Sequence, residues 1–289
     1  MFTLFFDTDC EITPTIAKKY NARLISMPYS IDGEETFPYI DFETYDAHAF
    51  NDMMRKGVLP STSAISVEEY RRYFEPELEK GNDILYVHFS RSMSATFGNI
   101  DEVKKELLEK YPERRIELVD TKFITLGSYA ICTQIGDLYN QGKSLDEIIE
   151  WAKTGIYKQG FYFFADNLKF FARSGRVSGF TAFMGGMIGI KPIIYIGDDG
   201  KMTTIDRAVG RKKVLEKLLQ YVIDAEENIK SYPVYIAHGD AQYLVDEFVP
   251  MLKKQFGEDL HIEVLDINPT IASHCGPDCL GVTFHAKHR

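Results

Sequence analysis

The sequence has few of the features that mark nucleic-acid-binding proteins. Its 33 Lys and Arg residues are outnumbered by 43 Asp and Glu residues, which gives a formal net charge of −10 at pH 7. Nucleic-acid affinity comes largely from clustered Lys and Arg that neutralise phosphates. We therefore expect no nucleic-acid partner and, for the same electrostatic reason, no affinity for an anionic membrane surface.

The sequence also lacks a long uninterrupted apolar run. The longest apolar stretch, Phe180 to Ile196, is interrupted by Lys191 and Pro192, so we expect no stable membrane insertion. The N-terminal segment, MFTLFFDTD, has no basic region, and its apolar run is too short for a signal peptide. We accordingly expect a cytoplasmic protein in which the four cysteines stay reduced. They are Cys10, Cys132, Cys275 and Cys279.

The composition is that of a folded α/β protein. Apolar residues make up 45% of the 289 residues, which is enough to bury a full core, and the length exceeds that of a usual single domain. Apolar runs of strand length alternate with segments of helical period, a pattern typical of a mostly parallel sheet. Because Gly155 separates two sets of such elements, we predict two α/β domains in series, residues 1–156 and 157–289.

Individual elements follow from the same periodicities. We predict strands at residues 2–6, 23–30, 84–89, 116–120, 160–165, 192–196, 201–205, 234–238 and 261–266. We predict helices at residues 13–20, 42–56, 66–79, 125–141, 145–153 and 211–228, with two more that end at residues 111 and 256.

Two carboxylates follow the first predicted strand, in the segment FFDTDCE. Haloacid-dehalogenase-type phosphohydrolases use such a pair, here Asp7 and Asp9, as nucleophile and acid/base at the carboxyl end of a strand. Those enzymes usually have Thr or Val two residues after the second Asp, where this chain has Glu11. The alternative is that Asp7 and Thr8 stabilise the turn and cap the next helix. The phosphohydrolase remains our alternative function.

Two segments rich in hydroxyl groups each lead into a predicted helix. They are PSTSAIS at residues 60–66 and SRSMSAT at residues 90–96. Helix N-termini present free N–H groups and the positive end of the helix dipole, so hydroxyl groups placed there suit a carboxylate or a phosphate. Ordinary N-capping explains either segment alone. Two such segments in one domain favour a shared anion-binding site.

The segment ARSGRVSG precedes the apolar stretch FTAFMGGMIGIKPII. It places Arg173 and Arg176 where their guanidinium groups can lie at the mouth of an apolar pocket. The alternative is that the apolar stretch forms ordinary core.

The segment SHCGPDCL at residues 273–280 combines a histidine with two cysteines. Redox pairs more often have two intervening residues, whereas Cys275 and Cys279 are separated by three. A structural zinc site needs four ligands, and the nearest further candidates are His285 and His288. The segment does offer a Gly-Pro turn with His274 at its start, after a predicted strand at INPTIA, residues 267–272.

Taken together and in order, these motifs resemble the DegV family, the fatty acid-binding subunits of bacterial fatty acid kinase. The resemblance covers essentially the whole chain. It rests on Asp7 at the end of the first strand, STS at 61–63, SRSMSATF at 90–97, ARSGRVS at 172–178, GIKPII at 189–194, HGDA at 238–241 and SHCGPDCLGV at 273–282.

The resemblance implies a lipid carrier that is not an enzyme on its own. Two α/β domains would enclose a long-chain fatty acid between them, and a separate kinase subunit would use ATP to phosphorylate its carboxylate to an acyl phosphate for phospholipid synthesis. The implied carboxylate ligands are Thr62, Ser63 and Ser94. Arg176 and His274 match the family's arginine and histidine near the head group, which assist phosphoryl transfer. The resemblance further implies a monomer with no metal and no cofactor besides the bound fatty acid.

The chain departs from the family pattern around His274. Cys275 stands where the family usually has Thr, Asp278 where it has the second Gly of Gly-Pro-Gly-Ala, and Cys279 where it has Ala. We interpret the segment as a turn that positions His274, with the cysteines as small substitutes rather than metal ligands. Asp278 adds a charge that bears on the basicity of His274 or on the contact with a kinase. Ala95 likewise replaces a usual glycine in the second hydroxyl segment.

Overall fold

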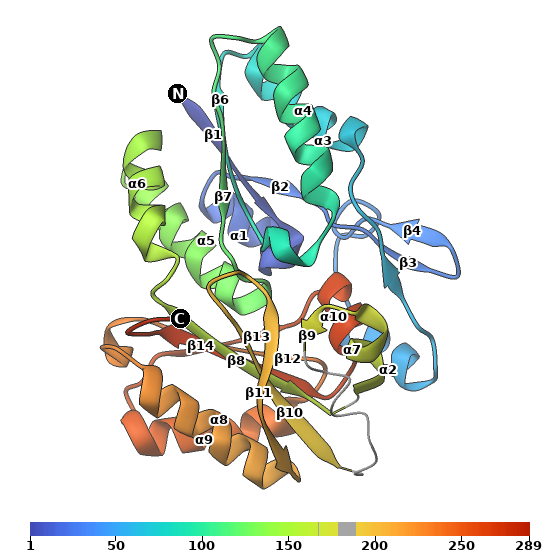
Figure 1. Ribbon diagram of the computed structural model, residues 1–289, viewed down its shortest axis with the longest axis vertical. Coiled ribbons are helices and arrows are strands. Elements are labelled where there is room, and N and C mark those ends of the chain that lie inside the picture. Colours follow the sequence, from blue (N-terminus) through green and yellow to red (C-terminus); the bar gives the residue numbers. More distant parts are fainter. Residues whose placement is uncertain (167, 179–188) are drawn as a thin grey trace.

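The computed structural model describes residues 1–166, 168–178 and 189–289, and Figure 1 shows that they form two stacked α/β halves. The first half is built on a parallel four-stranded sheet of order β2-β1-β6-β7, which confirms the mostly parallel sheet expected there. Its strands are β1 (Phe2–Asp7), β2 (Arg23–Ile25), β6 (Asp83–His88) and β7 (Ile116–Asp120).

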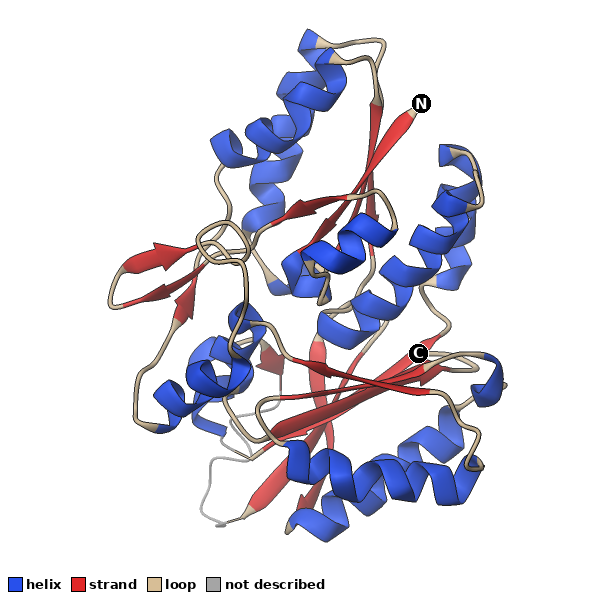
Figure 2. Ribbon diagram, turned by 180° about the vertical axis from the view of Figure 1, so that it is seen from behind, coloured by secondary structure: helices blue, strands red, loops and turns tan. Residues whose placement is uncertain are grey.

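Helices cover both faces of this sheet. The chain passes from β1 through α1 to β2 at one edge of the sheet, and from β6 through α4 to β7 at the other edge. Because both connections are right-handed and run in opposite directions, α1 and α4 lie on opposite faces (Figures 1 and 2). The short helix η1 follows β1, and η2 precedes α4. The helices of this half are α1 (Pro14–Lys19), α3 (Val67–Glu79), α4 (Thr96–Lys110), α5 (Thr125–Asn140), α6 (Leu145–Gly155), η1 (Thr8–Cys10) and η2 (Arg91–Met93).

The second half contains a mixed seven-stranded sheet of order β13-β12-β14-β8-β10-β11-β9. Only the pairs β12–β13 and β11–β9 are parallel among its described pairings, so the alternating pattern of helices and strands did not reveal its antiparallel centre. Its strands are β8 (Gln159–Ala165), β9 (Val177–Ser178), β10 (Ile190–Ile196), β11 (Met202–Val209), β12 (Val234–His238), β13 (Ile262–Asp266) and β14 (Cys279–His285).

The two faces of this second sheet pack against different parts of the chain. Helices α8 (Arg211–Ala225) and α9 (Gln242–Phe256) cover one face, as Figure 2 shows, and α5 of the first half contacts β8, β12 and β14. Alternation along β8 places Phe161 and Phe163 in the core shared with α5, and Tyr162 and Phe164 in the core beneath α8 and α9. The shared core therefore joins the two halves.

A small sheet and three helices lie near the junction of the halves. A small antiparallel sheet of order β4-β3-β5 is built from β3 (Tyr29–Ile31), β4 (Glu34–Thr36) and β5 (Ser61–Thr62). Helix α10 (Pro269–Cys275) contacts β3, β5, α2 (Ala47–Arg55) and α7 (Leu168–Ser174). Although α10 belongs to the second half of the sequence, it packs beside elements of the first (Figure 1). The division at residues 156 and 157 stays a prediction.

Three predicted elements are wrong in part. The predicted strand 23–30 is split into β2 and β3, because the N–H groups of Ser26 and Met27 bond to Tyr73 Oη and Thr8 Oγ1 at 3.2 and 2.9 Å instead of joining a ladder. The predicted helix 42–56 begins only at Ala47, after Asp46 caps it.

The third error is the strand predicted at residues 267–272, which is the start of α10. Asn268 accepts a hydrogen bond from the Ile271 N–H at 3.1 Å, and Pro269 occupies the first turn. An Asn-Pro pair is a typical helix start, because the side chain satisfies one free N–H and proline needs none. In the part of the chain that the structure describes, no helix combines the length and hydropathy needed to cross a membrane.

Candidate ligand-binding site

A cavity lies between the two halves, a common position for a ligand pocket. Its wall includes Ile124 and Leu126 from the start of α5, Phe161 and Phe163 from β8, and Ile271 from α10. These side chains are apolar and come from both halves of the chain. Of the apolar stretch predicted as pocket wall, residues 180–188 lie outside the described residues, and β10 contains residues 190–196.

All five predicted site residues line this one cavity. Thr62 ends β5 and Ser63 follows it, Ser94 lies between η2 and α4, Arg176 lies between α7 and β9, and His274 is in the last turn of α10. Separate segments of the sequence thus meet at one polar end of a largely apolar cavity. His274 is carried by a helix that Gly276 ends, not by a turn as we expected.

His274 is linked directly to the first hydroxyl segment. Its Nε2 lies 2.9 Å from Thr62 Oγ1, at hydrogen-bond distance. Burial, and then the nearby guanidinium groups of Arg176 and Arg173, lower the pKa of His274 to about 4. The imidazole is therefore neutral at pH 7, and the positive charge at this end of the cavity comes from arginine.

The other two predicted ligands differ in how free their hydroxyl groups are. Ser63 donates a hydrogen bond to the carboxylate of Glu35, so a ligand carboxylate at Ser63 has to replace that acceptor. Ser94 Oγ accepts a hydrogen bond from the Thr96 N–H at 3.3 Å, which leaves its own proton available for a ligand.

Both hydroxyl segments lead into a helix N-terminus, as predicted, but only the second has a predicted ligand residue directly beside that terminus. Ser94 directly precedes the cap residue of α4. Thr62 instead belongs to a strand, and α3 begins at Val67 with Ser66 as its cap. The first segment therefore gains its position from the small sheet rather than from a helix terminus.

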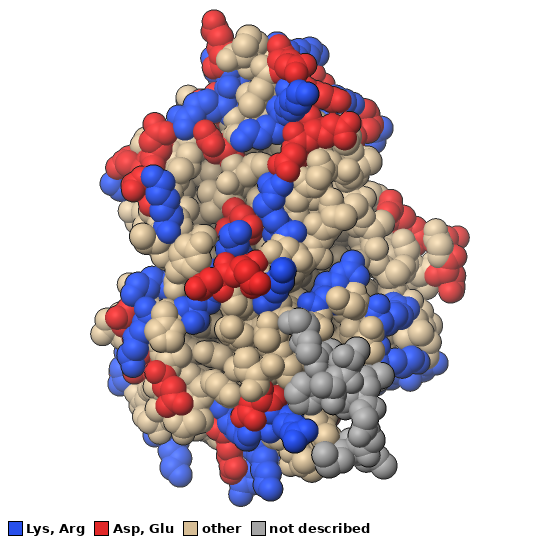
Figure 3. All heavy atoms as spheres, viewed as in Figure 1, with Lys and Arg blue, Asp and Glu red and all other residues tan. Residues whose placement is uncertain are grey.

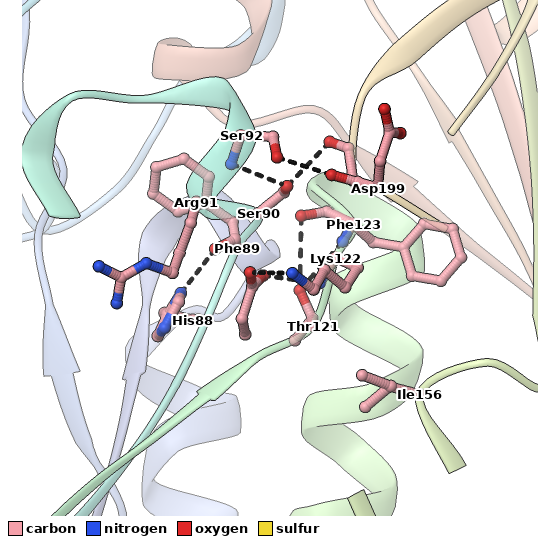
Figure 4. Close-up of polar contacts among 12 residues, drawn as sticks. His88, Phe89, Ser90, Arg91, Ser92, Thr121, Lys122, Phe123, Ile156 and Asp199 are labelled. Atoms are coloured by element: carbon pink, nitrogen blue, oxygen red, sulfur yellow. Dashed lines mark hydrogen bonds and ion pairs between the residues drawn. The ribbon is translucent and has the colours of Figure 1, made fainter. Parts of the chain in front are cut away.

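The second hydroxyl segment is hydrogen-bonded to the second half of the molecule, as Figure 4 shows. Ser90 Oγ donates to the Gly200 carbonyl at 2.8 Å, and Ser92 Oγ donates to the Asp199 carbonyl at 2.6 Å. Gly200 has φ +75°, and a Cβ there would lie 2.2 Å from Ser90 Oγ. No sequence pattern indicated that two serines of this segment join the halves while Ser94 lines the cavity.

A second hollow of about 770 Å³ adjoins the polar end of the cavity. Ser94 and Arg176 line both spaces, and Arg91 and Lys201 line only the outer one. In the space-filling view, Lys and Arg side chains lie beside Asp and Glu along the junction of the halves (Figure 3). The polar end of the cavity therefore borders a hollow with basic side chains in its wall.

Asp7 is bound into the fold rather than exposed to a ligand. Its Oδ1 accepts from the Cys10 N–H at 3.1 Å, and its Oδ2 accepts from Tyr86 Oη at 2.9 Å and from the Phe89 N–H at 3.3 Å. Burial raises its pKa to about 6. Asp7 caps η1 and does not line the cavity, which favours the capping interpretation over a phosphohydrolase nucleophile.

Cys275 and Cys279 are buried and line the cavity. The contact with Cys279, together with burial, raises the pKa of the Cys275 thiol well above its usual value. Of the further zinc candidates, His285 places Nδ1 2.8 Å from the Glu227 carbonyl. Within residues 1–166, 168–178 and 189–289, no group of three or more His, Cys, Asp or Glu side chains is arranged to hold a metal.

Asp278 directs its charge toward α2. Its Oδ1 lies 3.0 Å from Arg55 Nη2, and Arg55 also pairs with Asp240. The influences on the pKa of His274 are burial, Arg176 and Arg173, without Asp278 among them. Arg55 was not among the predicted residues, because no motif distinguishes it from other surface arginines.

The chain is thus a two-part α/β protein with a largely apolar cavity between its halves. The chain matches the family model described as "Uncharacterised protein, DegV family COG1307" over residues 1–287 and belongs to that family. A DegV domain-containing protein of Clostridium perfringens is 31% identical over 284 residues, which cover 98% of this chain and 97% of the relative.

Solved structures of the same family share the fold. A DegV family protein from Thermus thermophilus, described by its fatty acid binding, is 23% identical with a TM-score of 0.85, and 99% of each chain is covered. A stearic acid-binding protein from Eubacterium ventriosum is 21% identical with a TM-score of 0.86, also over 99% of each chain. The expected family and fold class are thereby confirmed.

Proposed function

We propose that this chain binds one long-chain fatty acid in the cavity and presents its carboxylate to a separate kinase subunit, which phosphorylates it to an acyl phosphate for phospholipid synthesis. The observation that carries this proposal is the meeting of Thr62, Ser63, Ser94, Arg176 and His274 at one end of an apolar cavity. Relatives whose descriptions name fatty acid or stearic acid as ligand support it.

The charged residues near the cavity determine which end of it holds the carboxylate of the fatty acid. Arg176 lines the polar end, and Arg173 lies near His274. A second region is acidic: Asp9 lines the cavity, and the buried Asp7 and Glu11 lie near Asp9 without lining the cavity. A carboxylate is attracted to the first region and repelled by any ionised member of the second, so the head group belongs at the hydroxyls.

Tail burial supplies the affinity in this proposal. A chain of about sixteen carbons gains up to roughly 12 kcal/mol at about 0.8 kcal/mol per methylene, before ordering costs. The head-group residues are then free to be neutral hydroxyl donors. Such donors orient the carboxylate without a strong ion pair that would weaken its attack on a phosphoryl group.

The outer hollow supports the transfer step. Because Ser94 and Arg176 border both spaces, a carboxylate held there is reachable from the hollow that Arg91 and Lys201 also line. In this proposal Arg176 and His274 stabilise the transferring phosphoryl group. Residues 1–156 contribute the hydroxyl groups and residues 157–289 most of the acyl pocket, and the carrier works as a cytoplasmic monomer without a metal or cofactor.

Mass spectrometry of organic extracts from the purified protein tests the binding proposal. We expect about one long-chain fatty acid per chain. Added fatty acid at about a hundred times its Kd should stabilise the delipidated protein by about 2.7 kcal/mol. Repeated extraction without an acyl chain, together with no thermal stabilisation, would overturn the proposal.

A further inference from the structure

The carboxyl group of Asp9 is an unexplained polar feature of the cavity wall. Asp9 lies in η1, is 5% exposed and lines the cavity. Its Oδ1 is buried without a hydrogen-bond partner. Among the described residues that have such an unpartnered atom, Asp9 is the only one in the cavity wall.

Such an atom is costly unless something pairs with it. An unsatisfied buried polar group destabilises the folded protein, and native structures normally pair these groups with protein, water or ligand. The Thr270 hydroxyl lies beside Asp9, but it donates its own proton to the Met27 carbonyl at 3.1 Å and has none left for Oδ1.

The surroundings of Asp9 favour an uncharged partner. Burial, then the nearby Asp7 and Glu11, raise the pKa of Asp9 well above its usual value. A protonated carboxyl group donates one hydrogen bond and accepts others. It therefore suits an alcohol or a ketone as its partner.

We propose that the cavity accepts an acyl chain that carries a hydroxyl or oxo group, and that this group pairs with Asp9. The inference rests on the proposed function and names the class of fatty acid that it selects. Asp9 is adjacent to Thr270, which lies one helical turn before His274 on α10. One turn rises about 5.4 Å, so the polar group belongs in the half of the acyl chain nearer the carboxylate.

Competition binding with positional isomers tests this inference. Stearate and a set of monohydroxystearates displace labelled stearate from the purified protein, and each isomer is scored by its affinity relative to stearate. We expect at least one isomer with its hydroxyl group in the carboxyl-proximal half to bind about tenfold more tightly than stearate, the gain of one buried hydrogen bond.

Substitutions of Asp9 test whether this residue causes the tighter binding of a hydroxylated isomer relative to stearate. Asp9→Asn keeps a donor and an acceptor and should retain the preference, whereas Asp9→Leu and Asp9→Ala should reduce the ratio to about one. Asp7→Asn is the matched control, because Asp7 belongs to the same acidic group but does not line the cavity. It should leave the ratio unchanged.

The outcomes separate the inference from the proposed function. If wild-type protein binds stearate but prefers no hydroxylated isomer, Asp9 holds only a trapped water and the inference is wrong. The inference is equally wrong if the preference persists in both Asp9→Leu and Asp9→Ala. If stearate itself does not bind, it is the proposed function that fails.

Discussion

The two hydroxyl segments resemble each other in sequence and differ in how the fold holds them. Residues 60–66 run through the short strand β5, and Thr62 lies at hydrogen-bond distance from His274. Residues 90–96 form η2 and the start of α4, and Ser90 and Ser92 bind the turn between β10 and β11. The comparison shows that a hydroxyl-rich motif alone does not reveal which hydroxyl meets the ligand and which joins the halves.

The largest expected effect concerns Arg176 and His274, which line the cavity beside the two segments. Arg176→Ala and His274→Ala should keep bound lipid while acyl phosphate formation with a cognate kinase, ATP and magnesium falls by about two or more orders of magnitude. The physical reason is the loss of a group that stabilises charge on the transferring phosphoryl group. Lipid is quantified in parallel, and loss of lipid as severe as in Ser94→Ala would place both residues in the binding site instead.

The next largest effect is expected from a substitution that disrupts the contact between Ser90 of the second segment and Gly200. Gly200→Ala combines a positive φ with a Cβ 2.2 Å from Ser90 Oγ, so we expect a loss of about 2–4 kcal/mol in the free energy of unfolding. Gly142→Ala is the matched control, because Gly142 has the same φ of +75° and open space around its Cβ. Denaturant unfolding should show the smaller loss there, and equal losses would refute the tight contact.

A smaller effect separates the two roles within the second segment. Ser94→Ala removes one hydrogen bond to a charged carboxylate, worth about 1.5–3 kcal/mol, so fatty acid affinity should fall while the buried tail retains some binding. Ser92→Ala removes only the bond to the Asp199 carbonyl and should leave affinity nearly unchanged. Titration with a fatty acid measures both, and similar losses would contradict the division of roles.

The smallest effect is expected at the cysteines beside His274. The double variant Cys275→Thr and Cys279→Ala should change folding stability by less than about 1 kcal/mol and leave lipid content unchanged, because both thiols serve as small wall residues. Thermal unfolding and lipid extraction check this, with metal analysis of the wild-type protein alongside. Bound zinc that disappears in the variant would show that the thiols are ligands.

Much of the first half could be predicted because its local signals agree with its tertiary structure. The strand predicted at residues 116–120 is β7, and the capping serine before α3 accepts the Glu69 N–H at 3.1 Å. The strand order of the seven-stranded sheet could not be predicted from the sequence, because strand pairing depends on partners far apart in the chain. β14, for example, pairs antiparallel with both β8 and β12.

The sequence by itself determined the family, the parallel sheet of the first half and the identity of five polar residues that line one cavity. These features depend on local periodicity and on motifs that keep their order along the chain. Only the tertiary structure decided that α10 crosses to the first half, that Asp278 faces Arg55, and that Asp9 lines the cavity without a partner. Each depends on contacts between residues far apart in the sequence, which no local pattern encodes.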